Sequence, residues 1–152
     1  MNAPILVPLD GSHLAETAIP YAVAQANRDN TPLLLVRAEP IPPFVLVPEA
    51  GVVSVQEYQR ETDQLHKEAL AYLNAKAEEL TADGLTVSTL SDLGDPVQVV
   101  LKAARDHSVM MIVLATHGRT GVNRWFFGSV AEDILRHSPV PVLLVRAQYP
   151  TE

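Results

Sequence analysis

The chain contains no cysteine, which excludes a disulfide framework, a thiolate nucleophile and a zinc or iron–sulfur site with cysteine ligands. Aromatic residues make up only 5% of the 152 residues, too few for a surface on which bases stack. Lys and Arg number 11 against 18 Asp and Glu, so the net charge is −7. Because a negative protein repels phosphate backbones and anionic lipids, we expect neither a nucleic acid nor a membrane as partner.

A long hydrophobic run is also missing. The apolar start, Ala3–Leu9, carries no basic residue and ends at Asp10, so we expect no targeting segment. The longest run elsewhere is 109–115, far below the ~18 apolar residues that a membrane span needs. We therefore expect a cytoplasmic protein. Hydrophobic residues at 47% predict a folded chain, and its length fits one domain over residues 1–152.

Short apolar runs alternate with helical patterns along the chain. The predicted strands are 5–9, 33–36, 85–90, 109–115 and 142–145. The predicted helices are one from 14 to about 27 with Pro20 as a kink, one that Gly84 ends, one after Asp95, and one that runs to about His137. This alternation predicts an α/β fold, a doubly wound, Rossmann-like parallel sheet of five strands with helices on both faces.

Serine and aspartate residues mark the expected helix starts. Ser12 is suited to cap the first helix, and Asp95 with Pro96 forms an N-cap followed by a first-turn proline. Ser129 and Glu132 have the spacing of a capping box, in which the two side chains satisfy N–H groups at the helix start.

Two segments that follow predicted strands are candidates for a ligand site. Asp10-Gly11-Ser12 follows the first strand, and 116–121 follows the fourth. Ligands of doubly wound sheets lie beyond the carboxyl ends of the strands, where the strand order reverses. The common orders are 3-2-1-4-5 and 2-1-3-4-5. Only the first places both segments beside one cleft, so we predict the order 3-2-1-4-5.

The segment 116–129 has the chemistry expected of a phosphate site. It contains His117, Arg119 and Arg124 and no acidic residue, which reverses the negative charge of the chain as a whole. Its glycines would let backbone N–H groups approach an anion, and a helix start at Ser129 would add unpaired N–H donors. The alternative is a solvated loop in which the capping box alone satisfies the helix start.

The common signatures of nucleotide and acyl chemistry are missing. The pattern G-x-x-x-x-G-K-[ST] of P-loop NTPases is absent. Absent too are a G-x-G-x-x-G after the first strand, which marks dinucleotide folds, and the G-x-S-x-G of a nucleophile elbow. The sequence therefore predicts none of these classes.

The chain resembles the universal stress protein family in segments 7–12, 115–121, 128–132 and 139–146. The resemblance covers essentially the whole chain, as in a single-domain member of that family. The family's nucleotide-binding branch has the pattern Gly, two residues, Gly, nine residues, Gly, then Ser or Thr. Gly118, Gly128 and Ser129 match this pattern, and Ala115 replaces the first glycine.

The resemblance implies a site for an adenine nucleotide, usually ATP, with AMP or ADP as alternatives and Mg²⁺ or Mn²⁺ as the accompanying ion. It implies that Asp10 lies near the ribose and the metal, that the Ala38 backbone contacts the adenine, and that Gly128 holds the outer phosphates. The full set of predicted site residues is Pro8, Leu9, Asp10, Ala38, Ala115, His117, Gly118, Arg119, Gly121, Arg124, Gly128, Ser129 and Val130.

The resulting hypothesis is an ATP-binding stress-response protein that acts as a sensor or regulator through a nucleotide-ordered loop and dimerisation. A homodimer is expected through the last strand, Val140 to Arg146, because this apolar stretch would be a sheet edge. The identity of any further protein partner stays open. Two alternatives remain, a slow ATPase or nucleotidyl-transfer enzyme and a nucleotide-independent interaction dimer. No residue is predicted as catalytic, because the sequence offers no P-loop lysine and no second carboxylate beside the loop.

Overall fold

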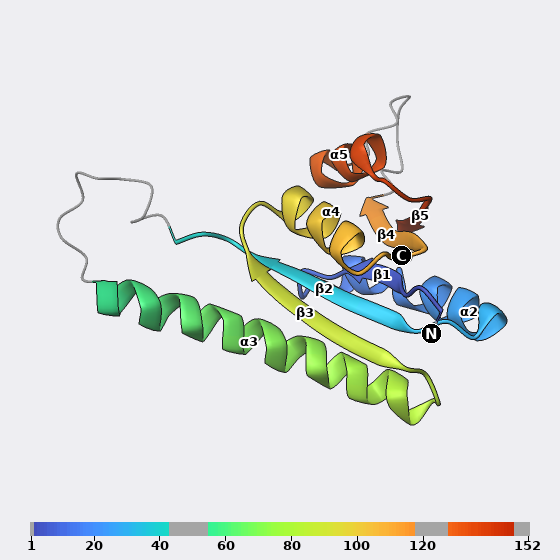
Figure 1. Ribbon diagram of the computed structural model, residues 1–152, viewed down its shortest axis with the longest axis horizontal. Helices are drawn as coiled ribbons and strands as arrows, with labels where there is room; N and C mark the ends of the chain where they lie inside the picture. The colour runs from blue at the N-terminus through green and yellow to red at the C-terminus, as the bar shows by residue number, and fades with distance from the viewer. Residues whose placement is uncertain (1, 43–54, 118–127, 148–152) are drawn as a thin grey trace, which may run out of the picture.

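The computed structural model describes residues 2–42, 55–117 and 128–147. Its strands are β1 Ile5–Pro8, β2 Leu33–Glu39, β3 Val87–Leu93, β4 Met111–His117 and β5 Val142–Ala147. Its helices are α1 His13–Glu16, α2 Ile19–Asp29, α3 Val55–Ala82, α4 Pro96–Asp106 and α5 Ser129–His137. The strands form one parallel sheet in the order β3-β2-β1-β4-β5 (Figure 1). The predicted fold class and strand order are confirmed.

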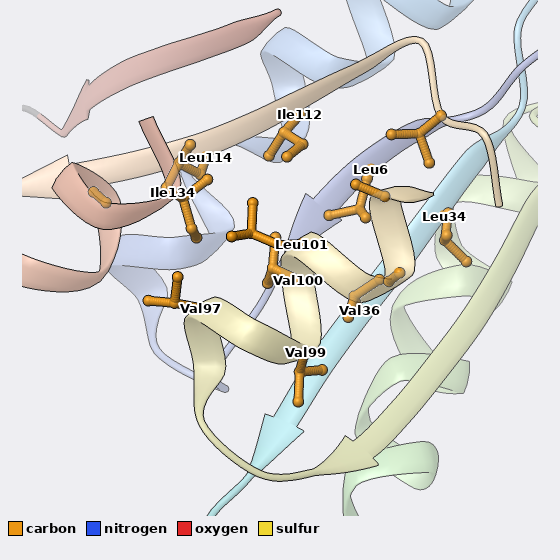
Figure 2. Packing of buried hydrophobic residues seen from close by; sticks show 14 residues of the cluster. Leu6, Leu34, Val36, Val97, Val99, Val100, Leu101, Ile112, Leu114 and Ile134 are labelled. Atoms are coloured by element: carbon orange, nitrogen blue, oxygen red, sulfur yellow. The ribbon is translucent and has the colours of Figure 1, made fainter. Parts of the chain in front are cut away.

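Helices cover both faces of the sheet because successive side chains of a strand point to opposite faces. On one face, α4 and α5 pack on strand residues such as Leu6 and Ile112, and Figure 2 shows Val100 of α4 among these side chains. On the other face, α1, α2 and α3 cover residues such as Val7 and Leu35. Each fully buried Leu or Ile contributes about 1.5–3 kcal/mol to folding, so both faces stabilise the sheet.

Two predicted helix caps are confirmed. The Ser12 hydroxyl accepts a hydrogen bond from the Ala15 N–H at 3.1 Å, at the start of α1. Asp95 Oδ1 accepts one from the Gln98 N–H at 3.1 Å, and a proline follows in the first turn of α4. These caps satisfy N–H groups that have no acceptor within the helix.

The predicted continuous helix over 14–27 is in fact two helices. α1 has Thr17 as its C-cap, whose hydroxyl donates to the Leu14 carbonyl at 2.6 Å, and α2 has Ala18 as its N-cap. Pro20 lies in the first turn of α2, where a residue without an N–H costs no helical hydrogen bond. The helix is therefore interrupted before Pro20, and no helix is kinked at this proline.

Several strands lie further along the chain than the hydrophobic runs predicted. β2 continues to Glu39, and β3 spans Val87–Leu93 instead of 85–90, because these two strands pair with each other up to their last residues. β4 spans Met111–His117 instead of 109–115 and pairs with β5. Hydrogen-bond partners, and not hydrophobicity alone, set these ends.

α3 is the longest described helix and lies beside β3, with its first turns extending beyond the end of that strand (Figure 1). It carries many charged residues, and only Thr62, Ala69 and Leu73 are buried. Within residues 2–42, 55–117 and 128–147, no helix combines the length and the apolar composition that crossing a bilayer requires.

Candidate functional site

The sheet opens between β1 and β4, where the strand order reverses. β1 pairs with β2 along its whole length, but with β4 only at Ile5 and Leu6. Ile5 donates its backbone N–H to Pro32, just before β2, and Leu9 donates to Val36 of β2, so the alternate residues of β1 face β4. Pro8 is one of these alternate residues and has no N–H, so it cannot donate the next bond to β4. The ladder stops there and leaves a cleft at the carboxyl ends of the strands.

A pocket of about 330 Å³ occupies this cleft. It is lined by every predicted site residue that the structure describes, namely Pro8, Leu9, Asp10, Ala38, Ala115, His117, Gly128, Ser129 and Val130. The other predicted residues, Gly118, Arg119, Gly121 and Arg124, lie outside the described residues. The fold thus brings together segments from β1, β2, β4 and α5 that are far apart in the sequence.

The sequence reasoning missed the apolar walls of the pocket, which are Leu14, Ala15, Val36, Pro96, Val100, Leu114, Ala131 and Ile134. Most of these side chains belong to the core, and in the sequence their periodicity marks them as core and nothing more. No sequence signal separates a core residue at a pocket wall from one elsewhere. Apolar walls of this kind suit a flat ring that is removed from water.

Ala38 presents an unpaired backbone edge to the pocket. Leu33 donates to Thr86 just before β3, and Glu39 accepts from Gly94 just after it. By alternation the N–H and C=O of Ala38 therefore face β1. The last bond on that side runs from the Leu9 N–H to the Val36 carbonyl at 2.8 Å. The Ala38 backbone makes no further hydrogen bond among the described residues. One donor and one acceptor therefore lie side by side at the pocket.

The turn after β1 holds Asp10. Its Oδ1 accepts hydrogen bonds from the Ser12 N–H at 2.9 Å and from the Ser12 hydroxyl at 2.5 Å. Gly11 between them has a φ of +86°, and a Cβ there would lie 3.2 Å from Nη1 of Arg37. A residue with a side chain would be strained and crowded at this position. The turn therefore requires glycine, and it fixes the Asp10 carboxylate at the pocket.

The start of α5 is open toward the pocket, and the predicted capping box is wrong. Gly128 is the N-cap, so Ser129 is the first helical residue, and no side chain of the described residues caps this start. Glu132 Oε1 instead accepts a hydrogen bond from Arg136 Nη2 at 2.6 Å. The first-turn N–H groups lack acceptors within the helix, and Ser129 and Val130 line the pocket. The positive end of the helix dipole is thus directed at this space.

Ala115 and Thr116 form the wall at the end of β4. Ala115 replaces a glycine of the expected pattern without strain, because only Asn30 and Ser108 among the described non-glycine residues have a positive φ. Its methyl group packs with the core on the α1 and α2 face. Thr116, which belongs to the candidate segment 116–121 but not to the predicted site residues, is 4% exposed, and its hydroxyl accepts a hydrogen bond from the Gly128 N–H at 3.4 Å.

Asp10 is the one carboxylate among the described lining residues, and His117, exposed at the rim, is the other titratable side chain. The described parts of the chain contain no group of three or more His, Asp or Glu that could hold a metal ion. Mg²⁺ usually binds through one or two carboxylates together with phosphate oxygens and water. The pocket fits a divalent ion only in that manner, with a bound phosphate as co-ligand of Asp10.

Comparison with known proteins identifies the family of this chain. The sequence model of the Universal stress protein family matches residues 1–146. The chain belongs to the universal stress protein family. A putative universal stress protein of Staphylococcus aureus (strain USA300) is 32% identical over 147 residues, which are 95% of this chain and 84% of that protein.

Solved structures share the fold of this universal stress protein. The structure of the hypothetical protein MJ0577 has a TM-score of 0.78 at 26% identity, over 98% of this chain and 99% of that one. The structure of a universal stress protein in complex with cAMP has a TM-score of 0.69 at 20% identity, over 96% of this chain and 98% of that one.

Proposed function

We propose that this universal stress protein binds an adenine nucleotide, ATP or its products ADP and AMP, and acts in the cytoplasm as a stress-response sensor or regulator. The observation that carries the proposal is a single pocket with a free backbone edge at Ala38 and an open helix start at Ser129. A purine base and a phosphate chain need these two kinds of partner. The relative solved with cAMP, itself an adenine nucleotide, supports the choice of base.

The backbone edge of Ala38 suits the Watson–Crick edge of adenine. The amino group N6 donates to a carbonyl, and the ring nitrogen N1 accepts from an N–H, so Ala38 would satisfy both. Guanine in the same orientation would place its O6 oxygen against the carbonyl, which leaves two acceptors facing each other. Walls such as Val36 and Val100 would cover the faces of the ring. The pocket therefore favours adenine over guanine.

The phosphate chain would extend from the ribose toward α5. Ser129 and Val130 offer main-chain N–H groups, and the Ser129 hydroxyl adds a further donor. Asp10 lies on the other side, where it would accept a hydrogen bond from the ribose or share a divalent ion with the phosphates. Such an ion would neutralise part of the phosphate charge. The charges at the two sides of the pocket are thus arranged for a nucleotide and its metal.

The lining favours binding over rapid hydrolysis. Fast phosphoryl transfer needs a metal bridge, a positioned nucleophile and charges that stabilise the transition state. Asp10 would contribute to the first of these requirements. Among the described lining residues, no lysine or arginine and no second carboxylate supplies the others. Binding without hydrolysis would still change the protein, because a ligand at 100 times its Kd stabilises the folded state by about 2.7 kcal/mol.

A homodimer through β5, over residues 140–146, is part of the proposal. β5 is one edge of the sheet, and Leu143 on it is 37% exposed. The opposite edge, β3, has the exposed polar residues Ser88 and Asp92, whereas β5 is apolar from Val142 up to Arg146, and polar and charged side chains on an edge oppose pairing with another strand. A two-fold axis beside β5 would pair the two copies antiparallel.

The direct test of nucleotide binding is the ligand content of the purified protein. Acid-denatured protein is analysed by mass spectrometry, and calorimetry then compares adenosine, ATP and GTP. We expect co-purified adenine nucleotide, an ATP Kd of about 1 μM to 1 mM, and weaker binding of GTP by about tenfold. Absence of a nucleotide together with no heat from millimolar ATP would overturn the proposal and leave the nucleotide-independent dimer.

A further inference from the structure

One side chain joins the start of α5 to the end of β4. Oγ1 of Thr116 accepts a hydrogen bond from the N–H of Gly128 at 3.4 Å, across 12 residues of sequence. Thr116 is 4% exposed, and its backbone stands opposite Arg146 in the pairing of β4 with β5. The sheet therefore fixes the hydroxyl, and the hydroxyl restrains Gly128.

Little else in the described chain directs this helix start. Gly128 is the N-cap and has no side chain, whereas Ser12 and Asp95 cap α1 and α4 with their own oxygens. Ala131 and Ile134 bury one side of α5 in the core. Apolar contacts are non-directional, so a helix held by them alone can rotate or slide slightly, while a hydrogen bond weakens steeply with angle. The direction of the first turn thus depends on the hydrogen bond from Gly128.

We propose that Thr116 is a positioning residue for phosphate recognition, an inference that rests on the proposed nucleotide function. Its hydroxyl holds Gly128 so that the N–H groups of Ser129 and Val130 face the pocket at a fixed distance from the base edge at Ala38. Thr116 lines the pocket, and its hydroxyl acts through Gly128. Its removal should therefore weaken ligands that carry phosphates and spare adenosine.

The test uses two substitutions that differ in a single property. Thr116→Val keeps the shape of the side chain and removes the acceptor, and Thr116→Ser keeps the acceptor. Calorimetry measures adenosine and ADP with each variant. We expect Thr116→Val to weaken ADP about tenfold and to leave adenosine within about twofold of the parent, while Thr116→Ser restores ADP binding to within about threefold.

A matched control separates this role from the loss of any threonine hydroxyl. Thr89 on β3 donates to Asn74 Oδ1 at 2.9 Å and does not line the pocket, so Thr89→Val should bind both ligands like the parent. The proposal is overturned if Thr116→Val binds ADP like the parent, if it weakens adenosine and ADP equally, or if Thr116→Ser fails to restore ADP binding.

A measurement without ligand separates this inference from the proposed function. Hydrogen exchange of the Gly128, Ser129 and Val130 amides is compared in the parent and in Thr116→Val. Faster exchange in the variant, by about tenfold or more, supports the restraint even if the parent binds no adenine nucleotide. Equal exchange rates in the two proteins would refute it, whatever the nucleotide experiments show.

Discussion

The phenol of Tyr72 on α3 donates a hydrogen bond to Oε1 of Glu16 on α1 at 2.7 Å, although 56 residues separate them in the sequence. Lys76, one turn along α3, lies 3.4 Å from the other carboxylate oxygen. The guanidinium of Arg37 lies over the Tyr72 ring, 5.2 Å from its centroid. Leu14 and Ala15 of α1 line the pocket, so the contacts of α3 with Glu16 stabilise the helix that forms this pocket wall.

Tyr72→Phe should destabilise the fold without disturbing its packing. The ring and its stacking with Arg37 remain, and only the hydrogen bond to Glu16 is lost. We expect a decrease of about 1–2 kcal/mol in the free energy of unfolding, measured by urea denaturation at neutral pH. Tyr21→Phe, at a side chain that is 55% exposed, is the control and should leave stability unchanged. Equal stability of Tyr72→Phe and the parent would mean that the bond contributes nothing.

The stability of the parent should fall at alkaline pH because of Tyr72. Burial, and then the hydrogen bond to Glu16, raise the pKa of the Tyr72 phenol well above its ordinary value. The folded state therefore holds this proton more tightly than the unfolded state. Its contribution is complete below about pH 10 and is lost as the pH rises above that value. Urea titrations at about pH 9, 10 and 11 should show that the free energy of unfolding falls more steeply with pH for the parent than for Tyr72→Phe. An equal fall in the two proteins would contradict this account.

Gly128→Val should weaken phosphate recognition strongly and leave the fold intact. A Cβ at Gly128 would have no atom within 4 Å, and the φ of −53° and ψ of 149° are open to any residue. A valine there would occupy the space beside the first-turn N–H groups of α5. We expect ATP affinity to drop at least tenfold, by roughly 1.4 kcal/mol or more, with an unchanged melting temperature. Gly128→Ala should lower the ATP affinity less than Gly128→Val does. ATP binding like that of the parent would place the phosphates elsewhere.

Asp10→Asn separates metal binding from the structure of the turn. An asparagine oxygen can still accept from the Ser12 N–H and hydroxyl, so the turn should persist while the charge is removed. We expect the increase in ATP affinity on adding Mg²⁺ or Mn²⁺ to disappear, and the metal-free affinity to remain within about threefold of the parent. Asp83→Asn, at an exposed residue between α3 and β3 that does not line the pocket, is the control for lost charge. A metal effect that survives in Asp10→Asn would exclude Asp10 as a ligand of the ion.

Any ATP hydrolysis should be slow. The described lining of the pocket has Asp10 for a metal but no further carboxylate or lysine. We expect phosphate release below about 1 s⁻¹ with Mg²⁺ or Mn²⁺, compared with the roughly 10 s⁻¹ of a median enzyme. A faster rate that Asp10→Asn removes would identify the protein as an ATPase.

Leu143→Lys should weaken the dimer. Leu143 is exposed on the free edge of β5, whereas Leu144 packs against the core, so a lysine at Leu143 tests the interface with less damage to the fold. Light scattering at micromolar concentration should report twice the chain mass for the parent and a shift toward the monomer for the variant. Ser88→Lys on β3 is the control and should stay dimeric. A parent that is monomeric under these conditions would contradict the proposed interface.

The strand order, and the expectation of a ligand site where that order reverses, followed from where polar motifs stand relative to apolar runs. Asp10 follows a buried run near the N-terminus, and 116–121 follows another one a hundred residues later. Carboxyl ends of parallel strands meet at one edge of a sheet, so these positions alone placed both segments beside one cleft. The resemblance added Ala38, and the structure showed that its backbone edge is unpaired.

The sequence by itself determined the alternation of strands and helices, the strand order, the caps at Ser12 and Asp95 and the segments that surround the cleft, because each depends on local pattern and chain direction. Tertiary structure alone decided the N-cap of α5, where the Gly128 N–H donates to Thr116 Oγ1 on β4 and Ser129 closes no box with Glu132. It also decided the apolar pocket walls and the hydrogen bond from Tyr72 to Glu16. These features depend on which groups meet after folding, and a polar side chain takes the partner that the packed helices and strands bring within hydrogen-bond distance.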